Sequence, residues 1–264
     1  MLQNQKALVT GSSRGIGLAI AEAYLKQNAQ VCLHSQLSIA DCPEVQAVLN
    51  EYRERACYIQ ADLTQEGEAE RLVEQAWNGF DGIDVLVNNV GTFREPSYLK
   101  LSKSDFDFIF NVNVWSAIAM SQAVVKRAVE AQRGGRILFT TSLNGSRSEP
   151  GHTLYDASKG AIDALTRQLA IELAPLGFTT AAVAPGLVET PLTDFGLRSD
   201  PSVRQAIIEQ IPIRRIATVD DIAGWFVFLA SPAARYATGI IIPVDGGLDA
   251  QQMSLRPLAQ SETA

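Results

Sequence analysis

KALVTGSSRGIG occupies residues 6–17 and joins an apolar run to a glycine-rich turn and the start of a helix. Residues 6–10 have the apolar character of a buried strand, and residues 16–26 have the periodicity and propensity of a helix. The turn between them holds three glycines, Gly11, Gly15 and Gly17. At such a turn, backbone N–H groups and the helix N-terminus can approach a pyrophosphate. The GxxxGxG spacing departs from the commoner GxGxxG, so this prediction needs support from the rest of the chain.

A second motif, YDASK at residues 155–159, places Tyr155 and Lys159 four residues apart. On a helix such residues share a face, so the Lys159 ammonium can lie near the phenol. A cation roughly 5 Å away, at an effective dielectric near 20, is worth about 3 kcal/mol, or about two pKa units. We therefore expect Lys159 to lower the pKa of Tyr155 and to make it a general acid or base.

Ser142 lies thirteen residues before Tyr155, at the end of the run RILFTTS, residues 136–142. This run is short, apolar and bounded by glycine and asparagine, which is typical of a buried strand. A hydroxyl at the carboxyl end of such a strand faces the ligand crevice of an open α/β sheet. A YxxxK pair alone is common on solvated helices, but Ser142 and the glycine turn together favour a catalytic site.

Strand-like runs alternate with helical ones along the chain, which indicates βαβ units. The expected strands lie near residues 6–10, 29–35, 56–61, 83–88, 136–142, 179–184 and 240–244. Two long helices are expected at about 105–132 and 155–174. The pattern predicts a doubly wound Rossmann fold with a mostly parallel seven-stranded sheet and helices on both faces. We expect one domain over residues 1–264.

Two segments depart from this alternation. Residues 187–215 carry several prolines around a short helix, and an insertion at the carboxyl edge of the sheet is where a substrate lid would lie. An ordinary surface excursion is the alternative. Residues 249–264 form a polar C-terminal tail.

Composition limits the possible functions. The 264 residues are 47% hydrophobic, enough for one core. The net charge is −7 and no long basic run occurs, which argues against nucleic acid as a partner. The three cysteines form no CxxC pair and suit a reducing compartment. The first strand begins near the N-terminus and no apolar stretch reaches about 18 residues, so we expect a cytoplasmic protein without a membrane partner. We expect no metal site.

The chain resembles the short-chain dehydrogenase/reductase family over essentially its whole length. TGSSRGIG at residues 10–17 is similar to that family's cofactor loop. NNVG at 88–91 is similar to its NNAG stretch, with Val90 replacing the usual alanine, which affects only local packing. PGLVET at 185–190 is similar to the family's segment beside the nicotinamide.

The resemblance implies a catalytic tetrad of Asn113, Ser142, Tyr155 and Lys159. Ser142 would bind the substrate oxygen, Tyr155 would exchange its proton, and hydride would pass between the substrate carbon and the nicotinamide. Lys159 would also bind the nicotinamide ribose, and Asn113 would hold a water on the proton path. Asp62 would face the adenine amino group.

The resemblance also assigns cofactor contacts to the glycine turn, the strand ends and the motifs above. These residues are Gly11, Ser13, Arg14, Gly15, Ile16, Gly17, Ser35, Asp62, Leu63, Asn89, Val90, Gly91, Tyr155, Lys159, Pro185, Gly186, Val188 and Thr190. NAD-preferring relatives carry an acid after the second strand, where this chain has HSQ at residues 34–36. Arg14 is similar to the basic residue that NADP-preferring relatives place there. NADP is therefore favoured, and NAD stays open because the usual second arginine is absent.

Residues at the family's substrate positions are polar. They are Arg94, Ser142, Asn144, Arg147, His152, Tyr155 and Glu189. This set favours a sugar, polyol or other small hydroxylated substrate over a steroid or long acyl chain, although His152 could instead cap a loop. The main alternative is a 3-oxoacyl-[acyl-carrier-protein] reductase, which needs a basic docking patch. Lys126 and Arg127 form the only adjacent basic pair in the long central helix.

A nucleotide-binding sensor or scaffold without activity is a third alternative, and the complete tetrad argues against it. A methyltransferase would have no use for the tetrad. Both long helices are apolar around more than one stripe, which predicts that they pair with two-fold copies of themselves. The last strand and the tail would supply a second interface. We expect a homotetramer, and at least a dimer, unless residues 187–215 cover the apolar surface.

Overall fold

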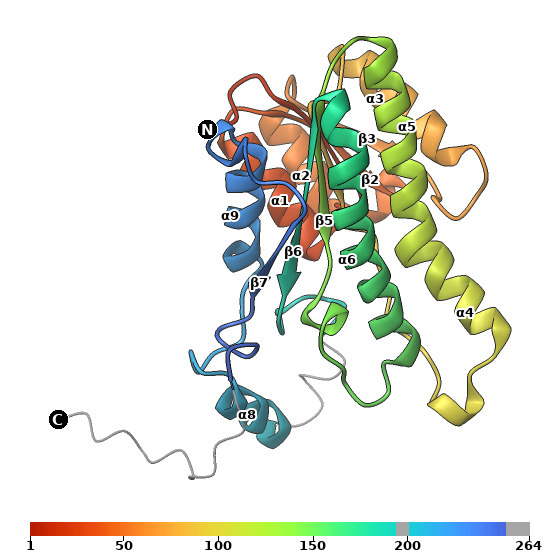
Figure 1. Cartoon of the computed structure of the whole chain (residues 1–264). Helices are drawn as coiled ribbons and strands as arrows, with labels where there is room; N and C mark the ends of the chain where they lie inside the picture. The colour runs from red at the N-terminus through yellow and green to blue at the C-terminus, as the bar shows by residue number, and fades with distance from the viewer. Residues whose placement is uncertain (194–200, 252–264) are drawn as a thin grey trace.

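Seven strands form one sheet at the centre of the protein (Figure 1). The computed structural model describes residues 1–193 and 201–251. The strands are β1 (Lys6–Val9), β2 (Gln30–Ser35), β3 (Ala56–Gln60), β4 (Val85–Asn88), β5 (Gly135–Thr140), β6 (Phe178–Pro185) and β7 (Ile240–Val244). Their order is β3-β2-β1-β4-β5-β6-β7 and every neighbouring pair is parallel. The predicted doubly wound sheet is confirmed.

Helices cover both faces of the sheet, as Figure 1 shows. One face carries α1 (Gly15–Lys26), α2 (Pro43–Tyr52) and α9 (Val219–Ala230), and the other carries α3 (Glu68–Phe80), α5 (Ser116–Glu130) and α6 (Thr153–Leu173). Side chains alternate along each strand, so Val9 packs with the first group and Leu8 with the second. Two cores therefore sandwich the sheet.

The direction of winding reverses between β1 and β4, which are neighbours in the sheet. The carboxyl ends of such strands border a crevice where ligands bind in open α/β sheets. The glycine turn after β1 and the NNVG motif at the end of β4 both lie at this edge.

The long helix predicted at 105–132 runs from Lys103 to Glu130 and contains a wider turn. It consists of α4 (Lys103–Phe110), the π-helical η3 (Asn111–Trp115) and α5. Ser116 N–H bonds the Asn111 carbonyl, five residues back rather than four. By length and composition this stretch could cross a membrane, but 44% of its most apolar window is buried and α5 packs on α3 and β4. Its apolar character is that of a core helix.

Two boundaries differ from prediction in ways that affect the site. β5 ends at Thr140, so Ser142 lies beyond the strand, where its Oγ accepts a hydrogen bond from Asn144 N at 3.2 Å. This bond begins the short 3-10 turn η4 (Leu143–Gly145) in place of further strand pairing. α6 begins at Thr153, two residues before Tyr155, and ends before η5 (Ala174–Leu176).

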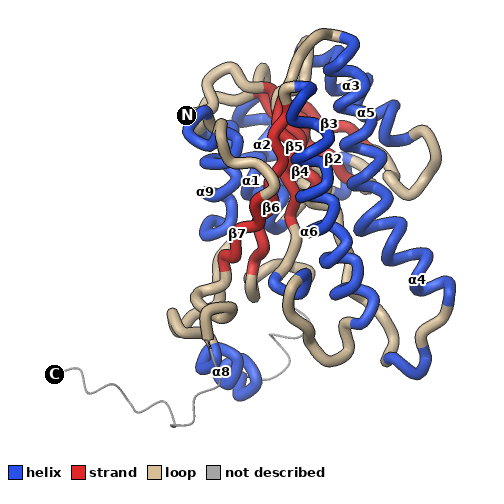
Figure 2. Tube along the Cα trace, viewed as in Figure 1, coloured by secondary structure: helices blue, strands red, loops and turns tan. Residues whose placement is uncertain are grey.

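The predicted lid segment contains α8 (Pro201–Gln210), which lies beyond the carboxyl edge of the sheet in Figures 1 and 2. Ile211 and Ile216 form a small core there with Leu187, Ile208 and Leu248. Residues 194–200 of the segment, and residues 252–264 of the predicted polar tail, lie outside the described residues. Short 3-10 turns complete the chain: η1 (Ile39–Asp41), η2 (Tyr98–Lys100) and η6 (Pro232–Ala234).

Candidate active site

The glycine turn has the backbone shape that its sequence predicts. Gly11 and Gly15 have φ of +62° and +60°, in the left-handed region that glycine tolerates best. A Cβ on Gly17 would lie 2.4 Å from the Gly11 carbonyl oxygen and 2.5 Å from Asn89 Nδ2. Glycine at residue 17 thus lets the first turn of α1 lie directly against the loop.

Asn89 holds the ends of three strands together. Its Nδ2 donates to the carbonyls of Thr10 and Gly11, at 3.2 and 3.1 Å. Its Oδ1 accepts from Thr140 Oγ1 at 3.0 Å. Asn89 therefore fixes the glycine turn against the ends of β4 and β5, and its side chain is used for structure.

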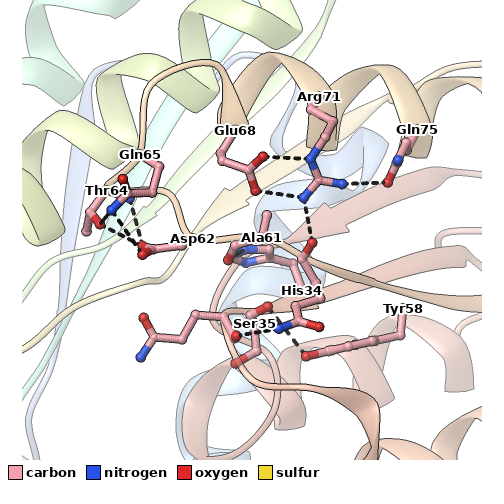
Figure 3. A network of polar contacts seen from close by, with 12 residues as sticks. His34, Ser35, Tyr58, Ala61, Asp62, Thr64, Gln65, Glu68, Arg71 and Gln75 are labelled. Atoms are coloured by element: carbon pink, nitrogen blue, oxygen red, sulfur yellow. Dashed lines mark hydrogen bonds and ion pairs between the residues drawn. The ribbon is translucent and has the colours of Figure 1, made fainter.

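His34, at the end of β2, also supports the glycine turn, and the sequence interpretation assigned it no role (Figure 3). Its Nε2 lies 3.1 Å from the Ala61 carbonyl oxygen, which can only accept, so Nε2 carries the proton. Nδ1 is then free to accept from Gly11 N at 3.2 Å. Burial lowers the pKa of His34 to about 4, which keeps this tautomer neutral. Nothing in the sequence around residues 34–36 predicts that the His34 ring connects Gly11 N to the Ala61 carbonyl.

Asp62 follows β3 at the same edge (Figure 3). Its Oδ1 accepts from Thr64 Oγ1 at 2.7 Å and from Thr64 N at 3.1 Å, and Gln65 approaches Oδ2. The hydrogen bond from the Thr64 side chain is the main cause of a lowered Asp62 pKa. Leu63 is buried beside it. An ionised acceptor is thus preformed at the position that the resemblance assigns to adenine.

The loop after β2 is held by side chains of the neighbouring strand β3. Tyr58 Oη donates to the Leu37 carbonyl at 2.6 Å, and Gln60 Nε2 donates to the Gln36 carbonyl at 3.0 Å. Ser35 Oγ accepts from Leu37 N at 3.3 Å. Residues 34–37 contain no carboxylate, and the exposed side chain of Arg14 makes no hydrogen bond or ion pair within the described residues. Ser13 and Ile16 lie beside Arg14 on the turn, buried and half-buried respectively.

Lys159 lies over the ring of Tyr155, with Nζ 5.6 Å from the ring centroid, and donates to the Thr140 carbonyl at 3.0 Å. The expectation that Lys159 lowers the Tyr155 pKa is wrong. Burial raises the pKa of Tyr155, opposed only in part by a hydrogen bond with Ser142. Burial affects the Tyr155 pKa more than the Lys159 charge does, because the ammonium faces the Tyr155 ring and the Thr140 carbonyl. Lys159 itself is buried, which lowers its pKa to about 8.

Asp163, one helical turn beyond Lys159, is a buried carboxyl group that the sequence interpretation also missed. Its Oδ1 accepts from Thr141 Oγ1 at 2.6 Å, and its charge partly restores the Lys159 pKa. Burial raises the Asp163 pKa in turn. Its i+4 spacing from Lys159 was the available signal. Asp163 and Thr141 together hold α6 against the end of β5.

Asn113, in the π-helical turn, holds the loop after β4. Its Oδ1 accepts from Thr92 N at 2.8 Å, and its Nδ2 donates to Thr92 O at 2.8 Å and to Ser158 Oγ at 2.9 Å. Ser158 Oγ continues to the Tyr155 carbonyl at 2.7 Å. Both Nδ2 hydrogens are used by the protein, so the side chain positions this loop, and the water expected at Asn113 stays a prediction.

Ser142 and Asn144 form part of a second chain of contacts beside Tyr155. Ser142 Oγ lies 3.3 Å from Asn144 Oδ1, and Asn144 Nδ2 donates to Asp156 Oδ1 at 2.7 Å. Asp156 Oδ2 accepts from Glu149 N at 3.1 Å. Asn144 therefore connects Ser142 to α6, and its contact with substrate stays a prediction.

The PGLVET segment faces the glycine turn from the other side of the crevice. A Cβ on Gly15 would lie 3.7 Å from Thr190 Cβ. Gly186 N donates to the Val244 carbonyl at 3.0 Å, and Val188 is buried in a bridge with Ala217. Pro185 ends β6. The predicted cofactor segments thus converge on one crevice.

The remaining substrate candidates differ in their surroundings. Arg94 is exposed on the loop after Gly91. Arg147 Nε donates to Asp249 Oδ1 at 2.6 Å, and Glu189 pairs with Arg204 of α8, so both already have partners. His152 packs against Tyr155, with ring centroids 5.9 Å apart. Within the described part of the chain, His152 is the one of these four that contacts Tyr155.

Comparison with known proteins agrees with this geometry. A family profile described as Enoyl-(Acyl carrier protein) reductase matches residues 11–249. The 3-oxoacyl-[acyl-carrier-protein] reductase FabG of Aquifex aeolicus is 34% identical over 247 residues, covering 94% of this chain and 98% of the relative. The chain belongs to the short-chain dehydrogenase/reductase family.

Solved structures of short-chain dehydrogenases/reductases superpose closely. A protein of Sinorhizobium meliloti 1021, provisionally assigned as a short-chain alcohol dehydrogenase, has a TM-score of 0.89 and 33% identity, covering 95% of this chain and 98% of that one. A protein of Agrobacterium tumefaciens, provisionally assigned as a 2-deoxy-D-gluconate 3-dehydrogenase and solved with NADP, has a TM-score of 0.86 at 33% identity and the same coverages. The chain is an oxidoreductase of this family, which binds a nicotinamide cofactor.

The crevice of this short-chain dehydrogenase/reductase fits such a cofactor. Gly17 allows the turn to lie close to α1, and a Cβ on Gly91 would lie 3.5 Å from Lys159 Nζ and 3.7 Å from Asn113 Oδ1. The backbone N–H groups at the α1 N-terminus have no side-chain cap. These are the features that an anionic dinucleotide needs: free donors, a helix N-terminus and no intruding side chain.

Proposed function

We propose that the protein transfers hydride between a nicotinamide cofactor and the secondary alcohol or ketone of a sugar, polyol or other small hydroxylated compound. The observation that carries this proposal is the polar surrounding of Tyr155. Ser142 hydrogen-bonds its hydroxyl, His152 packs on its ring, and Glu95 binds the N–H of the preceding residue. A steroid or acyl pocket would be mainly apolar. The relative provisionally assigned to 2-deoxy-D-gluconate also supports a hydroxylated substrate.

In this proposal the protein supplies orientation and proton transfer, and the cofactor, when bound, supplies or accepts the hydride. Ser142 Oγ hydrogen-bonds the substrate oxygen. Tyr155 Oη donates its proton to the substrate oxygen during reduction, and it takes the proton of the substrate hydroxyl during oxidation. Lys159 holds the nicotinamide ribose, and Asn113 fixes the loop at Thr92 so that the crevice keeps its shape.

We propose that NADP is the preferred cofactor, with NAD as the alternative. The absence of a carboxylate at residues 34–37 means that a 2′-phosphate would meet no repulsion there, and Arg14 is exposed on the adjacent turn. NADP is bound in one solved relative. Gln36, in place of a second basic residue, keeps the expected preference moderate.

A 3-oxoacyl-[acyl-carrier-protein] reductase is the second candidate function, favoured by the family profile and by the Aquifex relative. An acidic carrier protein needs a basic docking patch. Arg127, half of the predicted basic pair, lies 5.3 Å from the Trp77 ring centroid and 3.4 Å from Glu130, so part of its charge is already engaged. Less of the Arg127 charge is therefore left to support docking of an acidic carrier protein.

We propose a homotetramer, and at least a dimer, of one-domain chains in the cytoplasm. Apolar side chains are exposed on the long helix and on α6, which supports pairing of these helices: Phe106, Phe108, Trp115, Val129 and Ile171. Within the described part of segment 187–215, Leu187, Ile207, Ile208, Ile211 and Ile216 pack in a small core of their own. A second interface near α9 and β7 is supported by the exposed Trp225 and Tyr236.

A substrate panel with both cofactors tests the function. Sugars, polyols, sugar acids, simple ketones and a 3-oxoacyl thioester would be compared by the change in nicotinamide absorbance. We expect the highest kcat/KM with a hydroxylated substrate. Superior turnover of the thioester would instead establish the second candidate. No turnover of any compound, with tight cofactor binding, would point to a sensor or scaffold.

A further inference from the structure

Glu95, on the loop after β4, binds the start of the catalytic helix with one oxygen only. Its Oε2 accepts from Leu154 N at 2.8 Å, and Leu154 directly precedes Tyr155. Its Oε1 is buried and has no hydrogen-bond partner among the described residues. The carboxyl group is thus fixed in place, while half of its accepting capacity is unused.

The loop that carries Glu95 also contacts Tyr155 and His152. Phe93, two residues earlier on the same loop, lies edge-on to Tyr155 at 6.2 Å and to His152 at 5.7 Å between ring centroids. His152 Nδ1 is also buried without a hydrogen bond, although Glu149 Oε2 lies 3.4 Å away. Two unpartnered polar atoms therefore occur on side chains that adjoin Tyr155 or its helix.

A buried acceptor without a partner costs about 1–3 kcal/mol, so each such atom in a folded protein calls for an explanation. The partner that Oε1 lacks must be an O–H or N–H donor. The helix N-terminus favours a negative group at this position and fixes its second oxygen before any ligand arrives. An acceptor fixed in advance at the start of the helix that carries Tyr155 suits a hydroxyl group that is carried by the substrate.

We propose that Glu95 is a specificity-determining residue whose Oε1 accepts a hydrogen bond from a substrate hydroxyl close to the reacting carbon. The inference rests on the proposed function, because Tyr155 must act on the same molecule. It narrows the substrate class to compounds that carry a hydroxyl group near the reacting hydroxyl or keto carbon, such as vicinal polyols and sugar acids. An acyl chain has no donor for Oε1 and would leave it unpartnered.

The test compares each enzyme variant on a matched pair of substrates, a polyol from the panel and its analogue lacking one neighbouring hydroxyl. A hydrogen bond to a charged group is worth about 1.5–3 kcal/mol, so wild type should prefer the polyol by about 10- to 150-fold in kcat/KM. Glu95→Ala should reduce that preference to about threefold or less. Glu95→Gln keeps an acceptor for Leu154 N and should give an intermediate preference with near-normal stability.

A purely structural role would give a different pattern. Loss of a helix cap lowers turnover of both substrates equally and leaves the preference intact, which would overturn the inference, as would a preference that persists in Glu95→Ala because Oε1 binds only water. Asp105→Ala, which removes a capping carboxylate from α4, is the matched control and should leave the preference unchanged. Turnover of acyl thioesters without any polyol turnover would overturn the proposed function together with this inference, so the two failures are distinguishable.

Discussion

Lys159 Nζ faces the ring of Tyr155, 5.6 Å from its centroid, and is held there by the Thr140 carbonyl at 3.0 Å. The ammonium therefore stabilises the ring through a cation–π contact and leaves the phenol in a buried setting that raises its pKa. With this raised pKa, Tyr155 is poised as a proton donor. A cofactor and substrate that reorganise this contact would be needed to make it a base.

Replacing Tyr155 with Phe tests its proposed role in proton transfer. General acid/base catalysis contributes about 10²- to 10⁴-fold, so kcat should fall by that factor. The ring, its packing on Phe93 and the Lys159 contact survive, so cofactor affinity should stay within about threefold. Steady-state kinetics and cofactor titration by fluorescence measure the two quantities. Retained turnover of the true substrate would refute the assignment.

The buried Lys159 predicts a pH-dependent stability. Its pKa is about 8 in the folded protein and 10.5 unperturbed. Between these values the unfolded chain binds more protons, so the free energy of unfolding should rise with pH through this window. The gain should be on the order of 2 kcal/mol relative to Lys159→Met, which lacks the titration. Denaturant unfolding of both proteins at several pH values gives the difference, and parallel curves would contradict the burial argument.

Gly17→Ala should disrupt the cofactor turn. Its Cβ would lie 2.4 Å from the Gly11 oxygen, so the turn must move, and we expect at least a tenfold loss of cofactor affinity together with lower stability. Gly79→Ala is the control, since a Cβ there meets nothing within 4 Å. In helix α3 that change should be neutral or stabilising by up to about 1 kcal/mol. Equal effects of both substitutions would contradict the contact argument.

The buried contacts of His34 predict that its ring does not titrate in the usual range of histidine. Its pKa of about 4 means that the ring stays neutral until well below pH 5, and stability should be lost as pH falls from 6.5 toward 4. The chain has two histidines, so a His34→Gln variant assigns the ring signals in an NMR titration. That variant should also weaken cofactor binding by about tenfold, because the Gly11 contact is worth about 1 kcal/mol or more. Normal titration of His34 near 6.5 would exclude the buried tautomer.

Arg14→Ala tests the cofactor preference. If the guanidinium contacts a 2′-phosphate, kcat/KM with NADP should fall by about tenfold or more while the value with NAD changes little. Lys26→Ala, at the far end of α1, removes the same charge from the same helix as a control. A preference for NAD in wild type, or an equal loss with both cofactors, would show that Arg14 does not read the phosphate.

The sequence was sufficient for the seven strands of a parallel sheet and for the motifs at its carboxyl edge, because strand periodicity and glycine spacing are local properties. It was not sufficient for contacts between distant segments. His34 with Gly11, Asp163 with Thr141 and Glu95 with Leu154 join residues 22 to 59 positions apart through single side chains. The Tyr155 pKa was predicted in the wrong direction because sequence shows the neighbouring charge but not the burial.

The wide turn at Asn111–Trp115 amounts to one inserted residue in an otherwise regular helix. Deleting a residue there would restore α-helical geometry and improve its hydrogen bonding. The same deletion would rotate everything on one side of the turn by about 100° relative to the other, because each α-helical residue advances the chain by that angle. Asn113 could then no longer reach Thr92 while α5 kept its place on the sheet. A regular helix and a correctly placed Thr92 loop are therefore incompatible at this site. A more stable helix would lose the Asn113 contacts that hold this loop.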